Sequence, residues 1–427
     1  MTTTVSERTA QHPVLHVDLA AVTANVRTIG DHTAGELMAV VKADGFGHGM
    51  AGVAAAALDG GATCFGVTSI DEALQLRATG FGQRILSWLN PVDADFATAI
   101  GQGIELAVPS REHLDAIIAT GRLARVHLQL DTGMARDGAA PEEWAALCRA
   151  ARRAEILGAV DVVGVMGHLS CAAEPGHPAN ALGRNRFAWG LQIARGTGLR
   201  PTDRHLAATA ATLTDPLSHH TMSRIGAGLV GIDESRSTPL RSALTLTAPL
   251  VQVREVRAGT PVGYGQAWIA PARTRLGLIP LGYADGLARS ASTGAASTGS
   301  LSGGSQVLVS GVRRPVVGRI SMDMTVVDLG PDSAHCPATL GDTVTVFGPG
   351  DHGEPTTAQW AHWAGTLEHE IVTGLGARVE RRTSNGIGEV RQRHAAAPWA
   401  RRLRADRRDL RDPRGTGAVP GRDIRPA

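Results

Sequence analysis

The chain has 427 residues, a formal net charge of +2, 43% hydrophobic residues and 19% charged residues. This length predicts two domains, and the near-neutral charge gives no electrostatic basis for binding nucleic acid or a membrane. Residues 1–13 lack the features of a secretory signal, and no apolar run approaches the ~18 residues of a membrane span. We therefore expect a flexible N-terminus over 1–13 and a soluble, cytoplasmic protein.

The four cysteines are scattered along the chain, at Cys64, Cys148, Cys171 and Cys336. Their spacing fits neither a CxxC redox motif nor a zinc site. We expect free thiols of a reducing compartment, no disulfide framework and no metal site.

Short apolar runs alternate with amphipathic segments from about residue 37 to 232, which predicts repeated βα units around a parallel sheet. Helices are expected at 110–121, 142–155 and 180–196. Eight apolar runs are the expected strands: 38–42, 64–67, 84–88, 104–107, 125–130, 162–167, 203–207 and 223–227. Eight such units indicate an α/β protein with an N-terminal (β/α)8 barrel of the TIM type, which we assign to 14–240.

Lys42 stands out because it is the only lysine, so that 42 − 1 = 41 of the basic residues are arginines. It follows the apolar run Met38-Ala39-Val40-Val41 and precedes a glycine-broken turn. An amine can lose its proton and form an imine with a carbonyl compound, whereas a guanidinium group stays charged. A single lysine at a strand end therefore indicates chemistry, although survival by chance in an arginine-rich composition is the alternative.

The strand ends of this frame carry further polar residues. In a (β/α)8 barrel, catalytic groups come from the carboxyl ends of the strands. Five side chains are expected to face that one mouth: Lys42, Arg136, His168, Thr209 and Arg224.

The pattern changes after about residue 240 to short β-branched runs separated by Gly, Pro and Asp, which predicts a mainly antiparallel β domain over 241–384. Within it, the low-complexity stretch 290–305 is expected to be a mobile loop. Residues 385–427 lose periodicity and are expected to form a disordered arginine-rich tail. An RNA-binding arm is the weaker alternative for this tail, because aspartates interrupt the arginines and Trp399 is its only aromatic residue.

Five stretches between about residues 14 and 382 resemble motifs of alanine racemases, in the same order. They are VVKADGFGHG at 40–49, DTGMAR at 131–136, SRIGAGLVGI at 223–232, VGYGQAW at 262–268 with GYADG at 282–286, and GRISMDM at 318–324. The resemblance implies a racemase that uses pyridoxal 5′-phosphate, with the cofactor attached to Lys42. Lys42 and Tyr264 would be the two bases that serve opposite faces of the substrate, and Tyr264 is one of only two tyrosines.

The resemblance also implies roles for the other motif residues. Arg224 would donate to the pyridine nitrogen of the cofactor, and His168 and Arg224 would be the cationic neighbours that let Tyr264 act as a base. The cofactor-binding set implied in this way is Lys42, Phe46, His168, Thr209, Arg224, Ile225, Gly226 and His369. Arg136, Tyr283 and Met322 would bind the substrate, and a second subunit would supply Tyr264, Tyr283 and Met322, so that the active form is a homodimer.

Four positions depart from the pattern of the family. Gln129 stands where many members have a lysine that becomes carbamylated, and Ala208 replaces an asparagine. Phe46 and His369 stand where the family has tyrosines that contact the phosphate. Each lost neutral hydrogen bond contributes only about 0.5–1.5 kcal/mol, so the changes are expected to weaken cofactor retention or to mark a changed substrate.

The leading hypothesis is therefore an alanine racemase that supplies D-alanine for cell-wall synthesis. A racemase or epimerase of another amino acid is the second hypothesis, motivated by Phe46 and His369. The third is a pyridoxal-phosphate lyase or aldolase, or a cofactor-binding protein without turnover. The presence of both Lys42 and Tyr264 disfavours the third.

Overall fold

The computed structural model describes residues 12–292, 304–331, 338–384 and 389–390. Three of the predicted segments lie wholly or largely outside the described residues: 1–11 of the expected flexible start, most of the low-complexity stretch 290–305, and 385–388 and 391–427 of the expected tail. In the described part, no helix is long and apolar enough to cross a membrane.

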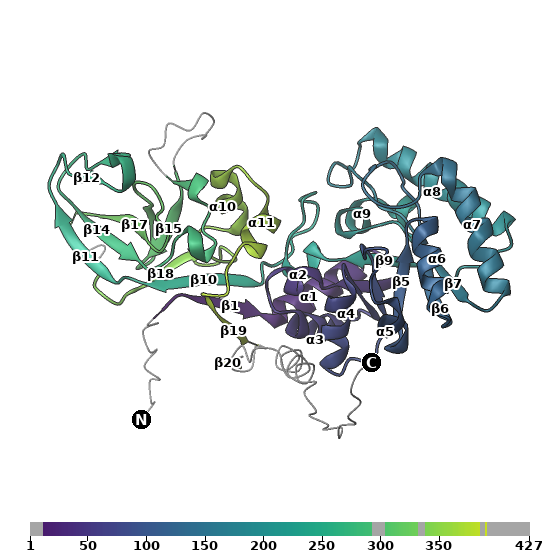
Figure 1. Cartoon of the computed structure of the whole chain (residues 1–427). Coiled ribbons are helices and arrows are strands. Elements are labelled where there is room, and N and C mark those ends of the chain that lie inside the picture. Colours follow the sequence, from purple (N-terminus) through teal and green to yellow (C-terminus); the bar gives the residue numbers. More distant parts are fainter. Residues whose placement is uncertain (1–11, 293–303, 332–337, 385–388, 391–427) are drawn as a thin grey trace, which may run out of the picture. The chain divides into compact units, whose positions relative to one another are not determined.

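Eight parallel strands form the predicted barrel (Figure 1). Their order in the sheet is β8-β7-β6-β5-β4-β3-β2-β9. Hydrogen bonds from the Arg224 amide to the Ala207 carbonyl (3.0 Å) and from the Thr221 amide to the Arg204 carbonyl (3.1 Å) join β8 to β9 and nearly close the ring. The strands are β2 (Glu36–Val40), β3 (Cys64–Val67), β4 (Ile85–Ser87), β5 (Ile104–Val108), β6 (Ala124–Gln129), β7 (Val160–Met166), β8 (Asp203–His205) and β9 (Met222–Ile225).

The helices between these strands begin at the capping residues that the sequence offers. Ser69 and Ser110 accept hydrogen bonds from the third amide of the helix that follows, and Pro141 and Pro178 occupy first-turn positions where a missing N–H costs nothing. The helical segments of this part are α1 (Leu19–Gly30), α2 (Lys42–Phe46), α3 (Met50–Gly60), α4 (Ile70–Ala78), α5 (Phe96–Gly101), α6 (Arg111–Ala119), α7 (Pro141–Ile156), α8 (Pro178–Gly196) and α9 (Thr209–Thr214), with short 3-10 turns η1 (Pro216–Ser218) and η2 (Ala227–Val230).

The second domain is built on a seven-stranded sheet and two smaller ones, and its pairs are antiparallel with one exception. The large sheet has the order β16 (Val312–Pro315), β15 (Gln306–Val309), β18 (Thr343–Phe347), β10 (Leu244–Pro249), β1 (Val14–Asp18), β19 (Glu380–Ser384), β20 (Glu389–Val390). The smaller sheets are β11 (Gln252–Val256), β14 (Thr274–Ile279) and β17 (Thr325–Gly330), and β12 (Pro261–Val262) with β13 (Trp268–Ile269). Helices α10 (Thr357–Ala364) and α11 (Glu368–Thr373) and the 3-10 turns η3 (Tyr264–Gln266), η4 (Tyr283–Asp285) and η5 (Arg289–Ala291) complete it.

Strand β1 corrects the domain boundary expected from the sequence. The sequence pattern assigns residues 14–18 to the barrel, but they pair antiparallel with β10 and parallel with β19 in the large sheet. Val14, Leu15 and Val17 are fully buried there. The local sequence predicts an apolar strand but carries no information about partners that lie 233 residues (14 to 247) and 366 residues (14 to 380) further along the chain.

Leu15 offers a test of this pairing. Leu15→Ala should lower the free energy of unfolding by about 2–5 kcal/mol, because it leaves a cavity in the core that packs on this sheet. Denaturant titration followed by circular dichroism would measure the loss. Val312→Ala, on the edge strand β16 with 37% of the side chain exposed, is the matched control and should cost less than about 1 kcal/mol. Equal losses in the two variants would contradict the position assigned to β1.

Candidate active site

The turn that follows β2 positions Lys42. The strand ends at Val40, two residues before the end expected from the sequence, and Lys42 begins the next segment. The residues after it adopt left-handed backbone angles, with φ of 52° at Ala43, 53° at Asp44 and 56° at Phe46. Side chains other than glycine rarely adopt these angles, so surrounding contacts must hold the turn.

Contacts from both domains hold this turn. Glu72 accepts a hydrogen bond from the Ala43 amide (2.7 Å), and its other oxygen is bound by Thr68. The Arg381 guanidinium donates to the Gly47 carbonyl (3.0 Å). A Cβ atom at Gly47 would lie 2.5 Å from the Val372 carbonyl oxygen, so only glycine lets α11 pack here. The position of the Lys42 amine is therefore set by residues on three separate segments.

A cavity of about 350 Å³ opens beside Lys42 at the carboxyl ends of the barrel strands. Seven of the residues singled out from the sequence line it: Lys42, Phe46, His168, Thr209, Arg224, Gly226 and His369. Two of the departing positions, Gln129 and Ala208, line it as well.

The Lys42 amine is suited to act in neutral form. Burial and the nearby charge of Arg136 lower its pKa, and the carboxylate of Glu72 acts in the opposite direction. A lower pKa makes the uncharged amine more abundant, and only the uncharged amine is a nucleophile or a base.

Arg224 is a buried residue of the cavity wall and is held by the strand ends around it. Its Nη1 donates to the carbonyl of His205 (2.8 Å), and its Nη2 donates to the carbonyl of Gly167 (2.7 Å). The same two nitrogens also donate to the Nδ1 atoms of His205 (3.0 Å) and His168 (3.2 Å). Burial lowers the pKa of Arg224 to about 10, so the group is still a cation at neutral pH.

His168 is neutral in this arrangement, which corrects one expectation. Burial and the charges of Arg224, Arg136 and Lys42 lower its pKa to about 3. Its Nδ1 atom accepts a hydrogen bond from Arg224, and it cannot do so when protonated. Arg224 is therefore the cation of this pair, and His168 is not the cationic neighbour that the resemblance implied.

Thr209 organises the loops after the seventh and eighth barrel strands. Its Oγ1 accepts hydrogen bonds from the amides of Gly226 (3.3 Å) and Gly228 (3.2 Å). The Gly226 amide is thus already engaged, and Ile225 is a fully buried strand residue that does not line the cavity. Because Thr209 Oγ1 accepts both of these bonds, its hydroxyl hydrogen remains available to donate to a ligand in the cavity. The amides of Ile225 and Gly226, which were expected to bind the phosphate, are less available than this hydroxyl.

The residues present fit a phosphorylated carbonyl cofactor. The cavity combines one amine, two nearby guanidinium groups and the Thr209 hydroxyl, a donor set for an anionic ligand with a reactive carbonyl. A Cβ atom at Gly226 would lie 2.8 Å from the Phe46 ring, so this position has no room for a side chain. The cavity wall at Gly226 is therefore formed by backbone atoms. Gln129 Oε1 is buried without a hydrogen-bond partner among the described residues, as expected of a group that awaits a ligand or Arg136.

The remaining predicted residues lie away from the cavity lining. Arg136 is exposed at the mouth, close enough for its charge to act on Lys42 and His168. Tyr264, Tyr283 and Met322 belong to the second domain and are 66%, 42% and 53% exposed. The segment around Met322 joins the two tyrosine turns: Ser321 accepts from the Tyr283 amide (3.0 Å), and Gly263 packs against Arg319. Backbone contacts thus connect the turns that carry these three exposed residues.

Phe46 and His369 are neighbours, with ring centroids 6.1 Å apart. His369 Nδ1 lies 3.5 Å from the Glu234 carboxylate, and all three residues line the cavity. Sequence reasoning missed two residues that line the cavity, Glu234 and Trp88. The Trp88 ring packs on Gly66, and a Cβ atom at Gly66 would lie 2.7 Å from this ring. Trp88 follows a barrel strand directly, and this position was the signal that could have revealed it.

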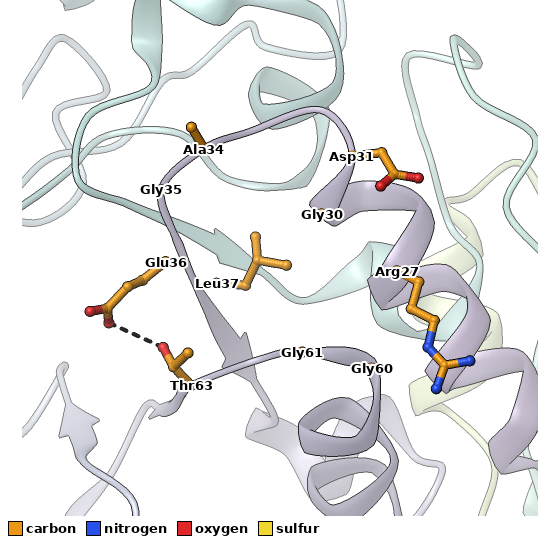
Figure 2. A pocket seen from close by; sticks show the side chains of 10 residues that line it. All are labelled: Arg27, Gly30, Asp31, Ala34, Gly35, Glu36, Leu37, Gly60, Gly61 and Thr63. Carbon is orange, nitrogen blue, oxygen red and sulfur yellow. Dashed lines mark hydrogen bonds between the residues drawn. The ribbon is translucent and has the colours of Figure 1, made fainter.

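A second cavity of about 440 Å³ lies at the amino ends of β2 and β3, opposite the Lys42 cavity. Figure 2 shows the residues that line it. Residues before and at the start of β2, such as Gly35 and Glu36, line it together with Thr63 before β3. It contains none of the residues predicted from the sequence. The amino ends of barrel strands support stability and are not the usual place of reaction, so we do not assign the chemistry to this cavity.

Comparison with known proteins identifies the fold and the family together. Residues 17–234 match the profile "Alanine racemase, N-terminal domain" and residues 243–383 match "Alanine racemase, C-terminal domain". The chain is 42% identical to an alanine racemase of Thermobifida fusca over 373 residues, which are 86% of this chain and 96% of the relative. It is 41% identical to an alanine racemase of Mycobacterium leprae over 86% of this chain and 93% of the relative.

Solved structures agree. The chain resembles the alanine racemase from D-cycloserine-producing Streptomyces lavendulae with a TM-score of 0.83 and 40% identity, covering 89% of this chain and 99% of the other. For the alanine racemase from Streptomyces coelicolor A3(2), the TM-score is 0.82 and the identity 41%, over 88% and 98% of the two chains. The fold and the lysine-bearing cavity define a two-domain barrel enzyme. The chain belongs to the alanine racemase family.

The pKa of His168 leads to a prediction about pH and stability. Its pKa is about 3 in the folded protein against the usual 6.5, so the unfolded chain binds more protons between these values. The free energy of unfolding should therefore fall as pH falls below about 6.5, and the contribution of His168 should be fully lost at about pH 3. His48, with a pKa lowered to about 4 mainly by burial, acts in the same direction.

Urea titrations of wild type and His168→Asn from neutral pH to about pH 4 would test this. Asparagine keeps an acceptor for Arg224 but does not titrate, so the variant should lose stability less steeply on acidification. His362→Asn, at an exposed histidine of α10, is the control and should follow wild type. Parallel curves for all three proteins would show that His168 is not buried in neutral form.

Proposed function

We propose that the protein is a pyridoxal-phosphate-dependent racemase that interconverts L-alanine and D-alanine. The observation that supports this most directly is the chain's only lysine, held by a left-handed turn at the mouth of the barrel beside a buried, charged arginine. The names of the relatives support the substrate. D-alanine supply for cell-wall synthesis in the cytoplasm is the role we infer for it.

Within the barrel domain, the cofactor would be attached to Lys42 and its phosphate would face the Thr209 hydroxyl, with the Gly226 backbone forming the wall beside it. Phe46 and His369 would close the phosphate side, with His369 as the polar group that replaces a tyrosine. Arg224 would face the ring nitrogen. When bound, pyridoxal phosphate withdraws electrons from the α-carbon of the substrate and so makes the α-proton removable.

Two bases would then exchange the proton on opposite faces of the α-carbon. Lys42 serves one face, since its lowered pKa favours the neutral amine. Tyr264 serves the other, and Arg224 is the buried cation that would favour its phenolate. Because a guanidinium group keeps its own proton, Arg224 orients the ring nitrogen without protonating it. Arg136 at the mouth would bind the substrate carboxylate.

We further propose that the active form is a homodimer. Tyr264, Tyr283 and Met322 are exposed and do not line the cavity that contains Lys42. A second copy of the chain would bring these three residues to the Lys42 cavity of the first. By symmetry, the first copy would bring its own three residues to the Lys42 cavity of the second. Burial of the exposed tyrosines and of Met322 would stabilise such an interface.

Racemisation of a different amino acid is the second candidate. The Phe46, His369 and Glu234 side chains at the cavity wall favour it, because they replace neutral hydroxyls by an apolar ring and an ionisable pair. A substrate panel distinguishes the two candidates.

The cofactor assignment can be tested on the purified protein. Incubation with pyridoxal phosphate, reduction with borohydride and peptide mapping should place the label on Lys42, because the chain contains no other lysine. Lys42→Arg, which keeps the charge but cannot form the linkage, should bind no cofactor covalently. A wild-type protein that acquires neither colour nor label would exclude the proposed enzyme.

The two-base assignment can be tested in deuterated water with single enantiomers of alanine, serine and larger amino acids. Wild type should invert alanine from either direction, with deuterium in the inverted product. Tyr264→Phe should nearly abolish inversion while exchange continues on the face that Lys42 serves, because one proton donor is lost. Faster turnover of a larger amino acid would favour the second candidate, and efficient inversion by Tyr264→Phe would refute the role of Tyr264.

A further inference from the structure

A row of buried polar side chains runs through the barrel interior from Arg224 to Glu105. The Nη1 atom of Arg224 contacts Nδ1 of His205 (3.0 Å), and Nε2 of His205 contacts Nδ1 of His127 (2.9 Å). The Nε2 atom of His127 then contacts the Glu105 carboxylate (3.0 Å). All four residues are at most 4% exposed, and they come from β9, β8, β6 and β5.

The direction of these hydrogen bonds follows from Arg224. A guanidinium group only donates, so Nδ1 of His205 must accept and the proton of His205 must be on Nε2. That proton is donated to Nδ1 of His127, which places the proton of His127 on Nε2, facing Glu105. Both imidazoles are therefore neutral and of the same tautomer, and a single chain of donors leads from Arg224 to a carboxylate.

The two ends of the row carry opposite charges. Burial would raise the pKa of Glu105, but hydrogen bonds from His127 and Arg125 and the charge of Arg84 outweigh burial and lower the pKa. Burial and the charge of Arg224 keep the pKa of His205 well below its usual range. A carboxylate thus polarises two neutral imidazoles toward a buried cation.

Arg224 has no other anionic partner in the described part of the chain. Its Nη1 and Nη2 atoms donate to carbonyl groups and imidazoles, and none of the described residues accepts from Nε. The Nε–H group is therefore the donor that remains for the cavity. A buried cation normally has an anion in direct contact. Here the anion is Glu105, and the two imidazoles of His205 and His127 lie between it and Arg224.

We propose that Glu105, His127 and His205 form a positioning relay that fixes the Arg224 guanidinium with Nε–H toward the cavity and compensates its charge at a distance. This inference rests on the proposed function, because it assigns the relay to the ring-nitrogen end of the cofactor site. A carboxylate in direct contact would neutralise the arginine and leave a weaker donor. The relay keeps the carboxylate two imidazoles away and so preserves a strong donor that retains its proton.

A metal site is the competing explanation for the same region. Ligand atoms of Glu105, His127 and Asp203 lie within 4.8 Å of one another. However, both nitrogens of His127 are engaged in the relay, Glu105 is bound by Arg125 (2.9 Å) and Asp203 is bound by Arg84 (2.6 Å). A guanidinium group thus already occupies one oxygen of each carboxylate, and His127 occupies the other oxygen of Glu105, which favours the relay over a divalent cation.

The relay can be tested first without cofactor or turnover. Nitrogen NMR of the full-length protein labelled with ¹⁵N-histidine, assigned with His127→Gln and His205→Gln, reports the protonated nitrogen of each ring. Both rings should be neutral with the proton on Nε2, and addition of Zn²⁺ should leave both signals unchanged. A cationic ring, a proton on Nδ1 or a zinc-induced shift would overturn the relay, whatever the enzyme proves to do.

The second test uses Glu105→Gln, with Asp203→Asn as the matched control. Both remove a buried carboxylate at the same end of the barrel, but only Glu105 belongs to the relay. With pyridoxal phosphate labelled by ¹⁵N in the ring, Glu105→Gln should shift the ring-nitrogen signal and lower kcat roughly 10-fold with little change in KM. Asp203→Asn should leave the ring-nitrogen signal at its wild-type position.

Identical ring-nitrogen signals in wild type and Glu105→Gln would overturn the role assigned to the relay. If Glu105→Gln does not fold, Arg125→Gln provides the second variant, because it removes the cation bound to Glu105. It leaves more of the carboxylate charge acting on His127 and should shift the ring-nitrogen signal in the opposite direction. A protein with the predicted histidine tautomers but no racemase turnover would refute the proposed function and leave the relay intact.

Discussion

The backbone turn from Lys42 to Gly47 is the constraint on which the site depends. A run of left-handed residues that are not glycine is costly, and it persists here because Glu72, Arg381 and α11 each bind or cover part of it. Two of these three contacts come from the second domain. The amine of Lys42 therefore has a defined position only when the barrel and the β domain are both folded.

Electrostatics explains why this cavity suits an anion. Lys42, Arg136 and Arg224 contribute positive charge, and Glu72 and Glu234 are the carboxylates near it. Burial and the same positive charges keep His168 neutral. The permanent positive charges of the site are therefore those of the arginines, which do not release protons at neutral pH. Proton transfer is thereby confined to groups that can titrate, such as the lysine amine and a tyrosine hydroxyl.

The sequence predicted the barrel well because eight apolar strands with helical segments between them are a periodic signal. It also located Lys42, His168, Thr209 and Arg224, since strand ends meet at one mouth and motif order fixed their places. It did not predict the partners of β1, because pairing over hundreds of residues leaves no local trace. Nor did it reveal His205, His127 and Glu105, which look like isolated polar residues until the ring closes and brings neighbouring strands together. The protonation of His168 also required the structure, because it depends on three neighbouring charges.

The placement of β1 has a consequence for the order in which the protein can assemble during synthesis. This strand leaves the ribosome before the barrel strands, yet its two partners begin at Leu244 and Glu380. The whole barrel sequence emerges before β10 is available, and the parallel partner β19 follows only after β18. Since such distant contacts cost loop-closure entropy, the β1–β19 pairing should form late, and nascent chains should expose an unpaired apolar strand until β10 has emerged. An enzyme whose reactive lysine depends on the second domain is thus inactive until α11 and β19 have been made.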